Sequence, residues 1–306
     1  MTDLARELRI VSLIPSGTEM VAALGLGDRL VGRSHECDFP AGVARLPVCT
    51  RPAFPVDGSS GEIDRRVRAI LEAGESLYVL DVETLTRLRP SHVVTQDQCA
   101  VCAVDARAVA RVARALPGGG AEVIALAPET LADVWDDIDR LGAALGVDGR
   151  AIAEVLRARA RAIAARAPAP RPRVLCIEWT DPIMIAGNWV PEMVRIAGGE
   201  PVLAEAGSHS PTLAAETALA ADAEVLLFMP CGFDLARALG DARTLVETPE
   251  WRETRAVRAG AVFVADGNRY FNRPGPRLID SIEILAEILH PAQFAFGHEG
   301  QGWRRL

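Results

Sequence analysis

The stretch that decides the fold is residues 9–25, which read RIVSLIPSGTEMVAALG. A short apolar run, residues 10–14, is followed by a Pro-Ser-Gly turn and then by apolar residues with helical spacing. Ser16 and Glu19 have the Ser-x-x-Glu pattern of a capping box, which predicts a helix that begins directly after the turn.

A second opening of the same kind begins at residue 173, where the strand-like RVLCIEW ends in the polar turn TDP. In open α/β sheets, ligands bind where strands end and helices begin, because the helix N-terminal amides are unpaired there. Since each half of the chain has one such opening, the sequence predicts two lobes that face one ligand.

Composition is that of a globular protein with room for two domains: 306 residues, 49% of them hydrophobic, with a formal net charge of -8. No stretch approaches the roughly 18 consecutive apolar residues of a membrane span. The sequence has no basic stripe with interleaved aromatic residues, so we do not expect nucleic acid as a partner. The first residues include Asp3 and Glu7, unlike the basic start of a signal peptide. We therefore expect a cytoplasmic protein as numbered, or a periplasmic one if the true start lies upstream.

The pattern of apolar runs predicts an N-terminal α/β lobe over residues 9–127, a helical linker over 128–171 and a C-terminal α/β lobe over 172–292. In the first lobe, buried parallel strands are expected at residues 10–14, 30–31, 77–80, 93–95 and 123–126. In the second, they are expected at 174–177, 225–229 and 262–265, before a last helix over 276–289. Capping pairs at Ser59 with Glu62 and at Thr130 with Asp133 predict two further helix starts.

The linker contains one long helix pattern over residues 148–166. An apolar stripe at helical spacing supports it: Ile152, Val155, Leu156, Ala160 and Ile163. A helix of that length spans about 28 Å. The predicted fold class is therefore α/β, with two open, Rossmann-like parallel-sheet lobes bridged by one long α-helix. Because the connection is helical, we expect closure by a small tilt rather than a wide hinge.

Further motifs follow the opening in a fixed order: LGxGDxLVG at residues 24–32, DVExLxxLxP at 81–90, AGG at 197–199 and YFxRPGPR at 270–277. In this order and spacing, the chain resembles the helical-backbone (class III) solute-binding proteins of ABC importers, which bind cobalamin, haem and ferric siderophores. Within that class it is similar to proteins assigned as cobalamin-binding. The resemblance implies a non-catalytic protein that holds a corrinoid in a cleft between two lobes and needs no cofactor. A ferric siderophore or haem is the alternative ligand.

A corrin is a wide, mostly apolar plate, and flat aromatic rings bury such a surface at little entropic cost. The aromatic candidates near predicted strand ends are Trp179, Trp189, Phe233, Tyr270 and Phe271, and Trp189 and Phe271 could equally belong to the core. The resemblance points to Tyr270 and Arg273 as ligand residues, with Arg273 donating to propionamide oxygens or to the phosphate of the nucleotide loop.

Polar candidates follow the predicted strands of the first lobe: Ser16, His35, Glu36 and Gln96. Ser16 at a helix N-terminus offers a hydroxyl and unpaired amides to a carbonyl or an anion, although a plain helix cap would explain it equally.

Two carboxylates match, through the resemblance, the exposed pair that docks onto Arg residues of the membrane permease: Glu83 in the first lobe and Glu216 in the second. A solvated helix charge would leave the same pattern. An ABC permease is therefore the expected protein partner, which conflicts with the missing signal peptide.

The cysteines leave a second hypothesis open. If the loops after the predicted strands converge, Cys37, Cys99, Cys102 and Cys231 would bring thiolates to one site, as zinc or another soft metal requires. The alternative function is then a cytosolic metal-binding protein or metalloenzyme, although only one Cys-x-x-Cys is present. His209 is either a loop residue or an axial ligand to cobalt. No P-loop, Gly-x-Gly-x-x-Gly or nucleophile-base pattern supports catalysis.

Overall fold

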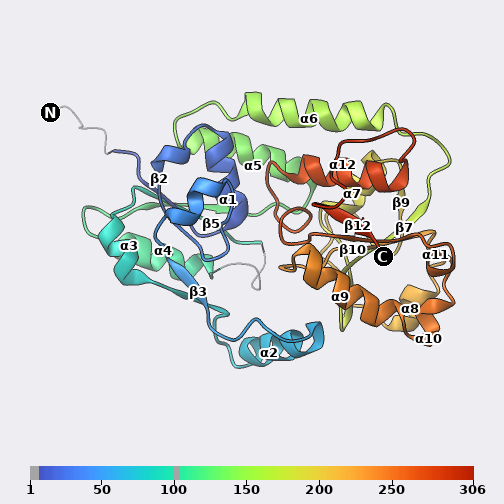
Figure 1. The fold of residues 1–306 in the computed structure, drawn as a ribbon. Coiled ribbons are helices and arrows are strands. Elements are labelled where there is room, and N and C mark those ends of the chain that lie inside the picture. The colour runs from blue at the N-terminus through green and yellow to red at the C-terminus, as the bar shows by residue number, and fades with distance from the viewer. Residues whose placement is uncertain (1–6, 99–103) are drawn as a thin grey trace. The chain divides into compact units, whose positions relative to one another are not determined.

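The computed structural model describes residues 7–98 and 104–306. It divides into two compact units (Figure 1). Unit 1 comprises Met1–Asp57, Arg65–Pro128 and Trp135–Glu154, and unit 2 comprises Gly58–Asp64, Glu129–Val134 and Val155–Leu306. Each unit is built on its own mainly parallel sheet, which confirms the expected α/β fold class.

The sheet of unit 1 has four parallel strands in the order β2 (Leu30–Arg33), β1 (Ile10–Ser12), β5 (His92–Gln96) and β6 (Glu122–Leu126). These strands confirm the predicted ones, because apolar residues such as Val11 and Val93 are buried in one core cluster. The helical elements of this part of the chain are α1 (Pro15–Ala23), η1 (Gly27–Arg29), η2 (Ala41–Arg45), α3 (Val82–Leu88), α4 (Ala106–Ala115) and most of α5 (Leu131–Ala144).

Helix α1 does not begin as predicted. It starts at Pro15 rather than after the turn, and Ile14 is its N-cap residue, with no side-chain cap. Proline is favoured at the first position of a helix because its fixed φ suits the helix and its missing N–H costs nothing there. Ser16 consequently lies inside the first turn, and the predicted capping box of Ser16 with Glu19 is wrong.

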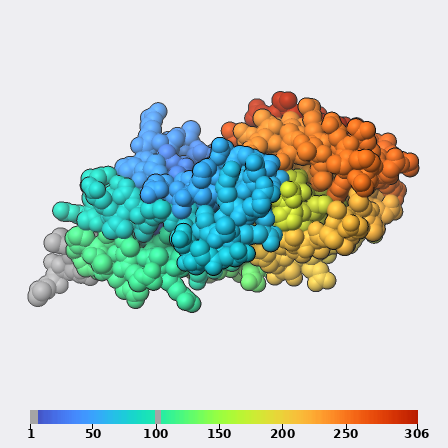
Figure 2. All heavy atoms as spheres, turned by 90° about the horizontal axis from the view of Figure 1, so that it is seen from below, coloured from blue at the N-terminus to red at the C-terminus, as the bar shows by residue number. Residues whose placement is uncertain are grey.

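The segment 77–80 is a strand, but not a buried parallel one. As β4 (Tyr78–Leu80) it pairs antiparallel with β3 (Thr50–Pro52), and Val79 is 36% exposed. Along the chain, α2 (Ser60–Glu72) lies between these two strands. The capping box predicted for its start is confirmed by the hydrogen bonds between Ser59 and Glu62. Most side chains of α2 beyond its first turn lie at the surface (Figure 2).

The sheet of unit 2 has the order β12 (Trp303–Arg305), β11 (Val262–Ala265), β10 (Val225–Phe228), β7 (Arg173–Thr180) and β8 (Ile183–Ile185), with β9 (Glu200–Pro201) pairing β7. The strands β7, β10 and β11 are parallel, as predicted, while the edge strands β8 and β12 are antiparallel and were not predicted. The helices of this unit are α7 (Val190–Ile196), α8 (Ala215–Leu219), α9 (Leu235–Val246), α10 (Pro249–Arg252), α11 (Arg255–Arg258) and α12 (Leu278–Leu289).

The connection between the units is helical, as predicted, through α5 and α6 (Arg150–Ala164). Thr130 and Asp133 cap α5 as expected. Helix α6 is shorter than the predicted 148–166 and spans about 22 Å. Val155, placed on the apolar stripe by the sequence, is instead 60% exposed. Across residues 7–98 and 104–306, no helix combines the length and apolarity that crossing a membrane requires.

Candidate ligand-binding site

Ser16 has the most unusual environment of the unit 1 candidates. Its side chain is 1% exposed, and its Oγ has no hydrogen-bond partner among the residues that the structure describes. It lies in the first turn of α1, where backbone N–H groups have no acceptor within the helix. A Cβ on the next residue, Gly17, would lie 2.6 Å from Val94 Cγ1, so the start of α1 is pressed against β5. The result is a buried hydroxyl beside helix amides at the carboxyl end of β1.

The loop after β2 is tied to α1 through Cys37. The Cys37 Sγ lies 3.0 Å from Thr18 Oγ1, which donates to it, and 3.2 Å from Ser34 Oγ. Cys37 is 1% exposed, which gives this predicted metal ligand a packing role within unit 1. The bonds hold the segment that carries His35 and Glu36 against the helix that carries Ser16.

His35 is an oriented, neutral imidazole. Its Nδ1 lies 2.8 Å from Thr50 Oγ1, and its ring lies 5.5 Å from the Tyr78 ring. Burial, and then the charge of Arg33, lower the pKa of His35 below its usual value, so the ring is uncharged at neutral pH. Glu36 beside it is exposed. Thr50 and Tyr78 were missed by the sequence analysis, because only the unpredicted pairing of β3 with β4 brings them to His35.

Gln96 is the last residue of β5, is 4% exposed and donates from Nε2 to Gln98 Oε1 at 3.2 Å. The carboxyl ends of β1, β2 and β5 lie at one edge of the parallel sheet. Ser16, His35 and Gln96 are therefore brought to the same edge, as the sequence predicts.

In unit 2, two of the predicted aromatic residues contact each other, with their ring planes tilted by 59°. The Trp179 and Phe233 rings lie 5.1 Å apart, and the Arg237 guanidinium lies 3.7 Å from the centre of the Phe233 ring. Phe233 is 3% exposed, whereas Trp179 is partly exposed. Arg237 also donates to the Gly58 carbonyl at 2.9 Å. Of this pair, Trp179 is the residue that retains surface to offer a ligand.

Trp189 has a contact that explains its burial without a ligand. It is the N-cap residue of α7, is 5% exposed and donates from Nε1 to the Phe271 carbonyl at 2.8 Å. The bond joins α7 to the loop after β11. This gives Trp189 a structural role in holding the loop that carries Tyr270 and Arg273.

Asn272 holds the loop after β11, residues 266–277, in place. Its Nδ2 donates to the Met229 and Gly267 carbonyls at 2.9 and 3.0 Å. Tyr270 is partly buried, and burial raises the pKa of its hydroxyl. Arg273 is 6% exposed and donates to Asn268 Oδ1 at 3.0 Å. Asn272 was missed by the sequence analysis, although it lies inside the YFxRPGPR motif. The motif thus builds a fixed loop that carries an aromatic ring and a guanidinium.

The two predicted docking carboxylates share one position. Glu83 is the second residue of α3 and Glu216 the second residue of α8, and both are exposed. A carboxylate in the first turn of a helix is favoured by the helix dipole. Both side chains are therefore available at the surface of the part of the chain that the structure describes.

The structure shows no metal site in the part of the chain that it describes, because no three His, Cys, Asp or Glu side chains there are placed to hold a metal ion. Cys99 and Cys102 lie outside the described residues, so the hypothesis stays a prediction. Cys231 is partly exposed and its N–H donates to the Glu178 carbonyl at 3.2 Å. The ring nitrogen Nδ1 of His209 lies 3.1 Å from the Ser210 carbonyl oxygen.

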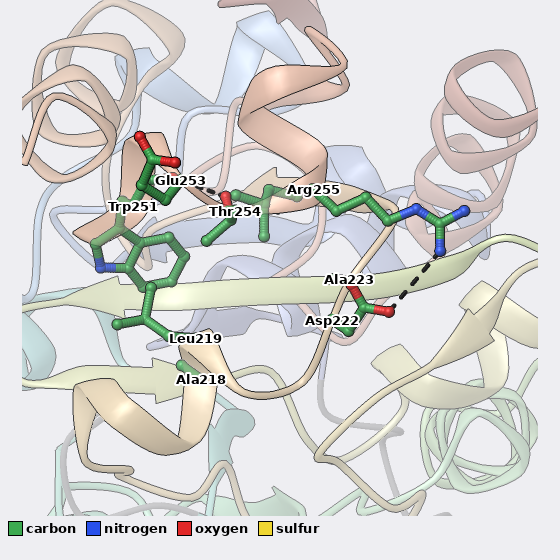
Figure 3. Close-up of a pocket in the computed structure, with 9 residues that line it drawn as sticks. Ala218, Leu219, Asp222, Ala223, Trp251, Glu253, Thr254 and Arg255 are labelled. Atoms are coloured by element: carbon green, nitrogen blue, oxygen red, sulfur yellow. Dashed lines mark hydrogen bonds and ion pairs between the residues drawn. The ribbon is translucent and has the colours of Figure 1, made fainter. Parts of the chain in front are cut away.

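Unit 2 also has a pocket at α8, α10 and α11, with a volume of about 170 Å³ (Figure 3). Trp251 and Leu219 form its apolar side, and Arg255 lies at the opposite side. The Arg255 guanidinium is already paired with Glu224, 2.6 Å away, and with Asp222, 3.9 Å away. Typical small-molecule sites measure about 300–1,000 Å³. This pocket is therefore too small for a plate-like chelate.

A family model described as "Periplasmic binding protein" matches residues 10–268. The chain belongs to this family. This binding protein is 23% identical over 289 residues to the vitamin B12-binding protein of Vibrio vulnificus, covering 91% of this chain and 89% of the relative. It is 25% identical over 292 residues to an ABC transporter substrate-binding lipoprotein, YvrC, of Bacillus subtilis, covering 94% and 81%.

Among solved structures, it resembles the periplasmic heme-binding protein RhuT from Roseiflexus sp. RS-1 in apo form, with a TM-score of 0.67, 25% identity and coverage of 94% and 99%. The match over nearly the whole of both chains supports the helical-backbone class of the fold. Members of the family are solute-binding proteins and not enzymes, so the expectation of a non-catalytic protein is confirmed.

Proposed function

We propose that this binding protein holds a corrinoid, cobalamin in the first place, through residues of both units and delivers it to an ABC permease. Curated relatives named for vitamin B12 and for ABC-transporter substrate binding support the choice. The heme-binding neighbour makes haem the main alternative. Both ligands are wide metal chelates with polar side groups at the rim, so both need apolar surface together with a few convergent hydrogen-bonding groups.

The observation that carries the proposal is the buried Ser16 hydroxyl. A buried polar group without a partner costs about 1–3 kcal/mol, and such groups are rare unless a ligand completes them. The hydroxyl and the amides at the start of α1 can donate to one oxygen of a ligand side group. A propionamide carbonyl of a corrinoid presents such an oxygen without a charge. The net charge of -8 on the protein gives no long-range attraction to the carboxylates of haem.

Unit 2 would supply the apolar surface. Tyr270 and Trp179 both retain exposed ring surface, and both follow the carboxyl end of a strand or lie near it. Arg273 stands on the same fixed loop as Tyr270 and can donate several hydrogen bonds in one plane. This assignment extends the sequence prediction, with Phe233 and Trp189 as supports behind the ligand-facing residues.

Changing Ser16→Ala should weaken cobalamin binding and leave the ligand-free fold intact. The loss of one hydrogen bond to the ligand corresponds to about 0.5–1.5 kcal/mol, or about two- to twelvefold in Kd. The melting temperature without ligand should stay equal or rise, because the hydroxyl has no partner to lose. Calorimetry and thermal melts measure the two quantities on the same samples. A variant with unchanged affinity would show that Ser16 is outside the site.

Changing Glu83→Ala together with Glu216→Ala should abolish stimulation of the cognate permease's ATPase activity in vesicles while cobalamin affinity stays unchanged. Both carboxylates are exposed, so their removal alters the docking surface alone. The proposal includes a location on the outer face of the membrane, where a binding protein hands its ligand to an importer. The matched control is Glu72→Ala with Glu250→Ala, exposed carboxylates of α2 and α10. Equal stimulation by both double variants would contradict the docking role.

A further inference from the structure

The C-terminal segment, residues 291–306, lies beyond the family match and is fastened to α12. The carboxylate of Glu287 on that helix accepts hydrogen bonds from the backbone N–H groups of Phe296, Gly297 and His298. It also accepts a bond from Trp303 Nε1 at 2.9 Å. Trp303 belongs to β12, which extends the sheet of unit 2. The segment is therefore an ordered part of unit 2: its first half is bonded to α12, and its end pairs with the sheet.

A series of aromatic contacts connects this segment to the predicted ligand residue Tyr270. Phe294 and Phe296 stack with ring centres 5.8 Å apart, and Phe296 lies 6.5 Å from the His298 ring. The His298 ring in turn meets the Tyr270 ring edge to face at 6.3 Å. The backbone of the segment also comes close to this ring, since a Cβ on Gly302 would lie 3.4 Å from Tyr270 Cε2. The C-terminal segment thus forms the support behind the Tyr270 ring.

His298 stands among charges from three elements. From α12, Glu283 Oε2 lies 2.9 Å from His298 Nε2, and Asp280 and Glu287 add negative charge nearby. From α6, Arg159 pairs with Glu283 at 2.6 Å and with Asp280 at 3.5 Å. From the loop after β11, the Arg277 guanidinium lies 5.8 Å from the centre of the Tyr270 ring.

The bond to Glu283 raises the pKa of His298 above its usual value, against the opposing effect of burial. Because the folded-state pKa is raised, the stabilisation is complete below the ordinary histidine pKa of about 6.5 and is lost as the pH rises through the higher folded value. The pKa values of the acidic partners shift in opposite directions. Burial acts to raise the pKa of Glu283, but the hydrogen bonds with His298 and Arg159 outweigh burial and lower it. Burial raises the pKa of Asp280.

We propose that charged His298 is a positioning residue for the Tyr270 ring, so that ligand affinity falls when His298 loses its proton. This inference rests on the proposed function, in which Tyr270 contacts the corrinoid. With His298 charged, the α12 carboxylates face both a guanidinium and an imidazolium. Without that charge, Asp280, Glu283 and Glu287 repel one another with less compensation, and the segment behind Tyr270 is held less firmly. A looser support costs affinity, because the ring must be ordered when the ligand binds.

The test is the Kd of cyanocobalamin, with hemin as a second probe, measured between about pH 5.5 and 9 by calorimetry. For the wild type, we expect the Kd of the probe that binds to rise about three- to tenfold across the range. His298→Gln retains a hydrogen-bond donor for Glu283 but no titrating charge, so its profile should be flat. The Kd of Tyr270→Ala should also be independent of pH, because the ring that transmits the effect is gone. If His298 had a purely structural role, the Kd of Tyr270→Ala would still change with pH.

The matched control is His92→Gln in unit 1. His92 also pairs with a carboxylate, Glu122 at 3.6 Å. We expect the His92→Gln variant to show the same change of Kd with pH as the wild type. A wild type that binds cyanocobalamin with the same Kd at every pH, or a His298→Gln protein with the wild-type slope, would overturn the inference and leave the proposed function standing. Binding of neither probe at any pH would overturn both.

Discussion

Glu287→Ala should lower the free energy of unfolding by about 3–5 kcal/mol. Glu287 is 5% exposed and accepts bonds from three consecutive backbone N–H groups and from the Trp303 indole. Removing the carboxylate leaves these donors without an acceptor, and each buried donor left unpaired costs about 1–3 kcal/mol when water does not replace the acceptor. The segment after α12 should detach, and β12 with it. Urea unfolding followed by tryptophan fluorescence measures the change.

Two further variants make this result specific. Glu287→Gln keeps one acceptor oxygen but turns an amide N–H₂ toward other donors, so about half of the loss is expected. Glu299→Ala removes an exposed carboxylate from the same segment and should change stability by less than about 0.5 kcal/mol. If Glu287→Ala unfolds at the wild-type urea concentration, Glu287 does not fasten the segment.

Tyr270→Ala should weaken cobalamin binding by about 1–3 kcal/mol, or about five- to 150-fold in Kd. The ring stands on a loop held by Asn272 and is supported from behind by His298 and Gly302. Its position is therefore fixed before the ligand arrives, which makes an aromatic contact effective. Calorimetric titration with cyanocobalamin at a pH below about 6.5 measures the loss when His298 is charged.

Tyr270→Phe is the matched variant, because it keeps the ring and removes only the hydroxyl. We expect it to bind within about threefold of the wild type, since a stacking contact does not use the hydroxyl. Equal and large losses in both variants would assign the contact to the hydroxyl instead. Wild-type affinity in Tyr270→Ala would place the ligand elsewhere.

Local patterns predicted much of the fold. The capping pairs at Ser59 with Glu62 and at Thr130 with Asp133 are present, because a capping box depends on residues only three positions apart. The central strands β1, β5, β7, β10 and β11 also follow from short apolar runs, since buried parallel strands need apolar residues on both faces.

Features that depend on distant residues were not predictable. The run at 77–80 looks like a buried strand, but its partner is β3, which leaves one face of the pair in solvent. Trp303 in strand β12 donates to Glu287 of α12, and no local pattern in residues 291–306 predicts that contact. In α1, the preference of proline for the first helical position outweighed the capping pattern at Ser16.

The candidate site shows the same division. The predicted strand ends put Ser16, His35 and Gln96 at one sheet edge, where the structure also has them, and their role as ligand residues stays a prediction. The sequence did not show which aromatic side chains are buried: Trp189 and Phe233 are 5% and 3% exposed, and they contact the Phe271 carbonyl and the Arg237 guanidinium. The sequence analysis missed His298, because its partner Glu283 lies 15 residues earlier. Glu283 is inside α12 and His298 follows that helix, so no local spacing links the two residues.

The central claim, that this protein is a corrinoid-binding protein, is tested most directly by calorimetric titration of the purified, ligand-free protein with cyanocobalamin and, separately, with hemin and a ferric siderophore. The account predicts saturable binding of one cyanocobalamin per chain, tighter than that of the other two. Saturable binding of hemin or the siderophore with no heat from cyanocobalamin would contradict it.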